Sequence, residues 1–170
     1  EVICLRGNHE QMLLQARSGP EALAYWDSAG GRQTLESFGA KNLDGIPQVY
    51  LDFFVEMPFW HETKGYLCVP GGVDFSQDDP FASPETLLWM RNWYDRIAYD
   101  RLGPRIILHG HTSIGLRHIQ EQHLNLDNTR YLNLDNGCVY ARRFKRTSDI
   151  GRLMAFVLES RELLWQEYAE

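Results

Sequence analysis

The stretch VICLRGNHE, residues 2–10, places an amide and an imidazole directly after a short apolar run. The run from Val2 to Leu5 is typical of a short buried strand, and Gly7 ends it. We therefore predict that Asn8 and His9 lie at the carboxyl end of a strand. Active-site residues of layered α/β folds are commonly found at such strand ends.

A second apolar run ends in the same way. Residues 105–108 read as a buried strand, and His109-Gly110-His111-Thr112 follows it. An amide oxygen and a neutral imidazole are both suitable ligands for a divalent metal ion. The two strand ends together predict one metal-binding site, and the alternative is that His9 and His111 are turn histidines with local hydrogen-bond partners.

The remaining pattern predicts helices in the first part of the chain and strands in the second, which indicates a layered α/β fold. We expect helices at 10–16, 21–27, 32–38 and 47–57, and another that begins at 83–85 with a Ser-Pro-Glu start signal. We expect strands in a hairpin over 60–69, at 130–134 and 138–140, and in a final hairpin over 153–158 and 162–168.

Composition narrows the class of protein. The chain has 170 residues, of which 44% are hydrophobic, as expected for one globular domain. A net charge of -6 argues against binding to nucleic acid, and no apolar run approaches the roughly 18 residues of a membrane span. The widely spaced Cys4, Cys68 and Cys138 are expected to be core residues in a reducing cytoplasm. A strand-like run at the first residue suggests a chain cut inside a domain.

Several motifs, in order, resemble the calcineurin-like metallophosphoesterases. RGNHE at 6–10 is similar to the third motif of that family, in the branch with Ser/Thr protein phosphatases and bacterial diadenosine tetraphosphatases. The resemblance continues through WDSAGGRQTLESFG at 26–39, LLWMR at 87–91, HGHT at 109–112 and LNLDNGCVY at 132–140. It covers nearly the whole chain. It implies an α/β fold in which helices flank a layered β-sandwich, as one domain over 1–170 with a helical insert at 18–58.

The resemblance also implies roles for single residues. Asn8 and His111 would be ligands of one of two divalent metal ions, and His9 would protonate the leaving oxygen. The metals would be manganese, iron or zinc, with nickel and cobalt as further candidates, and they would activate a bridging water for in-line attack. Arg91 would bind phosphate oxygens, although a helical arginine is also often a solvated charge or a salt-bridge partner. His109 would fix the orientation of a metal ligand.

Two departures from the family pattern weaken the expected metal site. The family's Asp-x-His and Gly-Asp-x-x-Asp-Arg-Gly motifs would precede residue 6, which makes the chain look truncated at its N-terminus. Where the family has Val-His-Ala-Gly, this chain has Val69-Pro70-Gly71-Gly72, and proline has no metal-binding side chain. His61 is a weak candidate to replace that ligand. We therefore expect weak or partial metal binding and little activity from this chain alone.

Three functions remain in order of preference. The first is a metal-dependent phosphoesterase that acts on a phosphoprotein or on a nucleotide substrate such as a dinucleoside polyphosphate, with neither nucleic acid nor membrane as a partner. The second, favoured by Pro70, is a non-catalytic binding or regulatory relative that has lost metal ligands. The third is a structural domain whose histidines only pack. The oligomeric state stays open.

Overall fold

The computed structural model describes residues 2–141 and 149–167. The chain divides into two compact units, Glu1–Phe59 and Trp60–Glu170, and each is described by itself. The helical insert predicted at 18–58 falls within the first unit. Both that insert and the single domain over 1–170 stay predictions.

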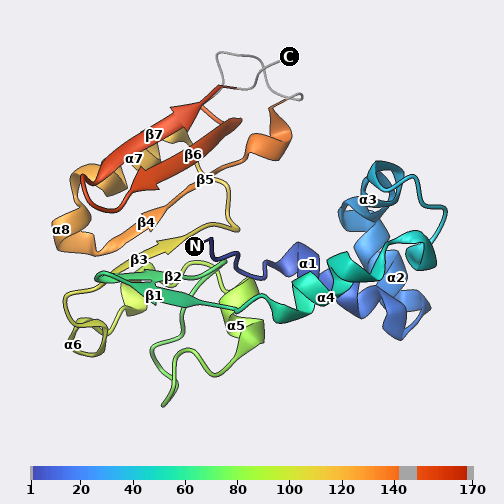
Figure 1. Cartoon of the computed structure of the whole chain (residues 1–170). Helices are drawn as coiled ribbons and strands as arrows, with labels where there is room; N and C mark the ends of the chain where they lie inside the picture. Colours follow the sequence, from blue (N-terminus) through green and yellow to red (C-terminus); the bar gives the residue numbers. More distant parts are fainter. Residues whose placement is uncertain (1, 142–148, 168–170) are drawn as a thin grey trace. The chain divides into compact units, whose positions relative to one another are not determined.

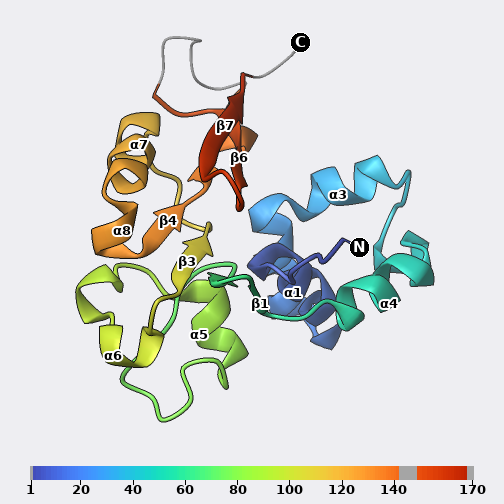
Figure 2. The ribbon, with the colours of Figure 1, turned by 60° about the vertical axis from the view of Figure 1, so that its left-hand side comes forward.

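The first unit is helical, as its sequence predicts. Its helices are α1 (Asn8–Gln15), α2 (Pro20–Trp26), α3 (Arg32–Ser37) and α4 (Gln48–Glu56), with shorter turns η1 (Ala16–Ser18), η2 (Asp27–Gly31) and η3 (Leu43–Gly45). Helix α1 lies against α2 and α4 (Figure 2). The buried side chains that hold these helices together include Met12, Leu13, Trp26 and Leu51.

The predicted strand over residues 2–5 is wrong. These residues form no strand, and Val2 is 87% exposed. A strand needs a neighbour that completes its backbone hydrogen bonds, and the described strands offer this segment none. The segment is instead held at its end, where the Arg6 N–H donates to the Pro58 carbonyl at 2.9 Å.

The second unit contains two sheets (Figure 1). The four-stranded sheet has the order β1 (His61–Thr63), β2 (Tyr66–Cys68), β3 (Ile106–His109) and β4 (Tyr131–Asn133), and the three-stranded sheet consists of β5 (Asp135–Asn136), β6 (Arg152–Val157) and β7 (Glu162–Gln166). Strands β2, β3 and β4 are parallel, whereas β1 and the second sheet are antiparallel. The predicted hairpin turn at Lys64-Gly65 is confirmed, with φ values of 40° and 86°.

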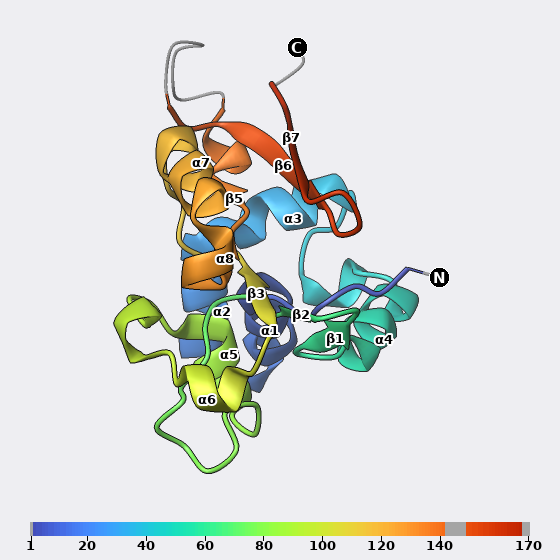
Figure 3. The same cartoon turned by 90° about the vertical axis from the view of Figure 1, so that its left-hand side faces the viewer.

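One core fills the space between the two sheets. Tyr66 and Phe156 meet edge to face at 5.9 Å, and the Tyr66 hydroxyl donates to the Leu158 carbonyl at 3.0 Å. Helices α7 (Leu116–Leu124) and α8 (Leu126–Thr129) add Ile119 and Leu126 to the same core (Figure 3). The second unit is thus a β-sandwich with flanking helices, and the predicted α/β fold class is confirmed.

The opposite face of the four-stranded sheet is covered by α5 (Pro84–Trp89), η4 (Tyr94–Arg96) and α6 (Tyr99–Leu102) (Figure 1). Ser83 caps α5 by accepting the Thr86 N–H at 3.2 Å, which confirms the predicted start of that helix. Trp93 is 1% exposed, and its ring lies 5.1 Å from His109. The aromatic layer therefore packs against the strand end that carries the histidines.

Other predictions near the C-terminus need correction. Residues 138–140 form the 3-10 helix η5 (Cys138–Tyr140) and not a strand, because Gly137 turns the chain with φ 68° and its carbonyl then accepts the Tyr140 N–H. Cys4 and Cys138 are exposed, so these two are not core residues, whereas Cys68 is half-buried and packs against the core. The final hairpin is confirmed, although Tyr168 lies outside the described residues. No helix in residues 2–141 and 149–167 combines the length and apolar character needed to cross a membrane.

Candidate active site

Asn8 and His9 lie in the first turn of α1, and not at a strand end. Gly7 is the N-cap residue, and its N–H donates to the Glu10 carboxylate at 2.8 Å. The first turn of a helix carries a partial positive charge from its aligned peptide groups, which favours an anion nearby. His9 is exposed and Asn8 is half-buried, so the helix presents an accessible imidazole where a phosphate would be favoured.

Arg6 fastens this segment to the rest of the first unit. Its guanidinium donates to the Val55 carbonyl and, at 3.2 Å, to the side-chain oxygen of Gln11. The same guanidinium lies over the Phe59 ring at 4.5 Å. These three contacts give Arg6 a structural role, and they hold the turn that precedes Asn8.

His109 ends β3 as a neutral, buried side chain. It is 5% exposed, and this burial lowers its pKa from 6.5 to about 4. Its two ring nitrogens lie 3.0 Å from the Tyr94 hydroxyl and 3.1 Å from the Gly110 carbonyl. A carbonyl only accepts, so Nδ1–H donates to Gly110, and Nε2 of the neutral ring accepts from Tyr94.

The chain turns sharply at His111. This residue has φ 70°, and the Thr112 N–H donates across it to the Gly110 carbonyl at 2.9 Å. A non-glycine residue in this conformation costs of order 1–3 kcal/mol and persists where its surroundings enforce it. The buried Asn133 supplies one such restraint, because its Nδ2 donates to the Thr112 carbonyl at 2.8 Å.

Arg91 lies beside this turn, and its predicted place in a helix is wrong. Helix α5 ends at Trp89, because Met90 is extended and the chain then turns to bury Trp93. The Arg91 Nη1 donates to the Thr112 hydroxyl at 2.9 Å, and the Trp89 ring meets His111 edge to face at 5.6 Å. The LLWMR and HGHT motifs, far apart in the sequence, thus converge within the second unit.

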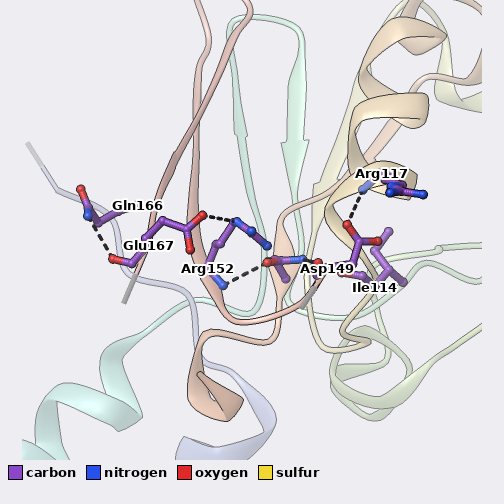
Figure 4. A network of polar contacts seen from close by, with 7 residues as sticks. Ile114, Arg117, Asp149, Arg152, Gln166 and Glu167 are labelled. Atoms are coloured by element: carbon purple, nitrogen blue, oxygen red, sulfur yellow. Dashed lines mark hydrogen bonds and ion pairs between the residues drawn. The ribbon is translucent and has the colours of Figure 1, made fainter. Parts of the chain in front are cut away.

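Two buried asparagines support the turn, and neither was predicted as a site residue. Besides Asn133, Asn136 donates from Nδ2 to the Ile114 carbonyl at 2.9 Å and to the Asp149 carbonyl at 2.8 Å. Figure 4 shows the Arg117 backbone N–H bonded to the Asp149 carboxylate, and Arg152 paired with Glu167. In the sequence, LNLDNG places Asn133 before the predicted turn and Asn136 within it. In the structure, both side chains bridge separate backbone segments.

Pro70 lies next to the histidine-bearing strand end. Its carbonyl accepts the Gly110 N–H at 3.0 Å, so position 70 lies on the strand adjoining His109 and His111. His61 is paired in register with Cys68, which places its backbone at the same end of the sheet. Residue 70 thus follows β2 and lies beside Gly110, and the replacement of a metal ligand by proline at this position stays a prediction.

The residues present do not form a complete metal site. In the part of the chain that the structure describes, no three His, Cys, Asp or Glu side chains lie together as metal ligands. The predicted ligands Asn8 and His111 belong to different units, and a catalytic ion normally has at least three protein ligands. The described residues therefore do not fit a bound metal ion by themselves.

The comparisons with known proteins give one match. The family model described as calcineurin-like phosphoesterase matches residues 1–150. Neither a curated protein nor a solved structure matches the chain significantly.

Proposed function

The chain belongs to the calcineurin-like phosphoesterase family, and we propose that it is a metal-dependent hydrolase of phosphoprotein or dinucleoside polyphosphate substrates. The family match extends over most of the chain and supports a phosphoesterase function in general. The substrate class and the roles of single residues are our proposals.

One observation supports the assignment most directly. The hydrogen bond from Arg91 to Thr112 brings a guanidinium beside the strained turn at His111. A planar guanidinium donates several N–H groups, and Arg91 uses Nη1 for Thr112. The remaining donors suit the oxygens of a phosphate group, which a guanidinium binds through paired hydrogen bonds. This geometry is a reason to assign Arg91 to phosphate binding.

His9 is the proposed general acid. Its ring is exposed at the first turn of α1, so it is free to approach the ester oxygen of a substrate. When water attacks phosphorus and the ester bond breaks, His9 would give its proton to the leaving oxygen. Divalent metal ions, when bound, would activate the water. Asn8 of the first unit and His111 of the second stay predicted ligands, and three ligand side chains do not lie together in the described residues.

The test is manganese-dependent hydrolysis of p-nitrophenyl phosphate by the protein. A general acid typically contributes about 10²–10⁴-fold to the rate, so His9→Asn should lose at least about 100-fold in kcat. His118→Asn removes an exposed histidine of α7 and should leave the rate unchanged. Circular dichroism verifies that both variants are folded. Wild-type rates in His9→Asn would refute the general-acid role.

Pro70 favours a second candidate function, a non-catalytic relative that binds phosphorylated partners. The proline stands at the sheet edge beside Gly110, where it contributes a backbone carbonyl and no ligand side chain. Binding of a phosphopeptide without turnover, in buffer with manganese, would support this candidate over the enzyme.

A further inference from the structure

A small pocket lies beside His9. Its volume is about 100 Å³, and its walls come from five elements of the first unit, α1, α2, η2, α3 and α4. His9 and Leu13 belong to α1, Trp26 ends α2, Gly30 lies in η2 and Phe54 belongs to α4. The exposed His9 connects this pocket to solvent, whereas Leu13 and Trp26 are buried. The residue proposed as the general acid therefore borders a hollow whose lining is about equally polar and apolar.

The pocket is formed by a break between α2 and α3. Here the chain kinks between the two helices, and Gly30 has a non-helical φ of 105°. A Cβ at Gly31 would lie 2.5 Å from the Trp26 ring, so glycine at this position lets the indole sit flat against the backbone. Trp26 is 3% exposed as a result, and its ring forms a fixed wall.

The polar groups of the lining are already engaged within the protein. The Thr34 hydroxyl donates to the Gly30 carbonyl at 3.3 Å, and the Glu10 carboxylate accepts the Gly7 N–H at 2.8 Å. The ionisable residues in the lining are His9 and Glu10, and it contains neither lysine nor arginine. A polyphosphate chain would meet a carboxylate here and no permanent cation, which disfavours an anionic leaving group.

Volume gives a second limit. An apolar cavity of about 150 Å³ holds one benzene molecule, so a pocket of about 100 Å³ accepts a branched alkyl group or the edge of one ring. A nucleoside is much larger than this. The charge of the lining and the volume of the pocket thus both favour a small, uncharged leaving group.

We propose that the substrate is a phosphate monoester of a compact, uncharged alcohol, and that this pocket receives the organic part of the leaving group. This inference rests on the proposed phosphoesterase function and, within it, excludes the dinucleoside polyphosphate as substrate. The oxygen of a water molecule forms the new bond to phosphorus, and the ester P–O bond breaks with its electron pair on the leaving oxygen. His9 gives that oxygen its proton, and the proton released by the water returns to His9 through solvent. The products are inorganic phosphate and the free alcohol.

The activity test compares leaving groups of similar acidity and different bulk. The full chain is assayed with manganese on phenyl phosphate, 4-tert-butylphenyl phosphate and diadenosine tetraphosphate. We expect kcat/KM for phenyl phosphate to be about tenfold or more above that for 4-tert-butylphenyl phosphate, because a group that does not fit its pocket typically costs this much. Phe54→Ala should enlarge the pocket and reduce that preference at least threefold. Equal rates for both aryl esters, or faster cleavage of diadenosine tetraphosphate, would overturn the inference and leave the phosphoesterase function standing.

A binding test keeps the inference separate from catalysis. Phenol is titrated into the protein, and the NMR signals of the His9 ring and the Trp26 indole are followed. Ala29→Leu fills the pocket and should abolish the phenol-dependent shifts, whereas Ala24→Leu makes the same change at an exposed position outside the lining. If no phosphate ester is hydrolysed, the proposed function fails, and this titration alone shows whether the pocket binds a small uncharged alcohol. Unchanged phenol shifts in Ala29→Leu would overturn the inference.

Discussion

At the scale of single residues, His109 links burial to a pH-dependent stability. Its side chain is buried between Trp93 and Tyr94, which lowers its pKa to about 4, whereas in the unfolded chain it titrates near 6.5. Between these values the unfolded state binds the additional proton, so folding stability is complete above pH 6.5 and falls as the pH is lowered. Each pH unit in this interval changes the free energy of unfolding by up to about 1.4 kcal/mol.

We therefore predict that lowering the pH from 6.5 to 4 reduces the free energy of unfolding of the wild type by about 3 kcal/mol more than that of a His109→Gln variant. Urea unfolding at several pH values, in the presence of a chelator, measures this difference. His118→Gln changes an exposed histidine and should follow the wild-type pH dependence. Identical pH profiles for wild type and His109→Gln would show that His109 protonates equally well in both states.

The sequence predicts which side chains belong to the candidate site, but it does not predict their local geometry. Ordered motifs single out Asn8, His9, Arg91 and His111, and the structure brings Arg91 and His111 together through Thr112 and Trp89. The left-handed conformation at His111 was not predictable, because an Asn133 side chain from a distant strand enforces the turn. Tertiary hydrogen bonds of this kind leave no local pattern in the sequence.

At the scale of elements, the kink before α3 depends on close packing against Trp26. A methyl group at position 31 would approach the indole to 2.5 Å, and such overpacking typically costs roughly 1–3 kcal/mol. We predict that Gly31→Ala lowers the free energy of unfolding by that amount, measured by urea denaturation. At Gly19 nothing lies within 4 Å of an added Cβ, so Gly19→Ala should cost clearly less. Equal costs for the two variants would contradict the packing role.

The elements that the sequence predicts well are those with strong local signals. The Pro-containing starts of α2 and α5 and the Lys64-Gly65 turn are fixed by backbone chemistry that acts within a few residues. The apolar run over 2–5 lacks such a signal, because strand formation depends on a partner elsewhere in the chain. Helix α7 was not predicted, and Ile119 is the one residue among its nine that is buried.

At the scale of the whole molecule, the metal site is limited by the number of ligands. The chain carries a net charge of -6, so an anionic substrate depends on metal ions and on single cations such as Arg91. Asn8 belongs to the first unit and His111 to the second, and three ligand side chains do not meet anywhere in the described residues. Adding one ligand within the second unit is therefore a direct test of the site.

Position 70 is the place for that ligand. Its carbonyl already bonds the Gly110 N–H at 3.0 Å, and an imidazole there would start from the strand next to His111 while the backbone bond is kept. A histidine at position 70 would place two histidine ligands, at positions 70 and 111, within the second unit. We predict that Pro70→His tightens manganese or zinc binding at least about tenfold, in line with the 10–100-fold effects that supporting groups have on metal affinity. Isothermal titration calorimetry measures the change, and His111→Ala in the same background should remove it. Unchanged affinity in Pro70→His, or a gain that survives the loss of His111, would mean that position 70 does not face the metal site.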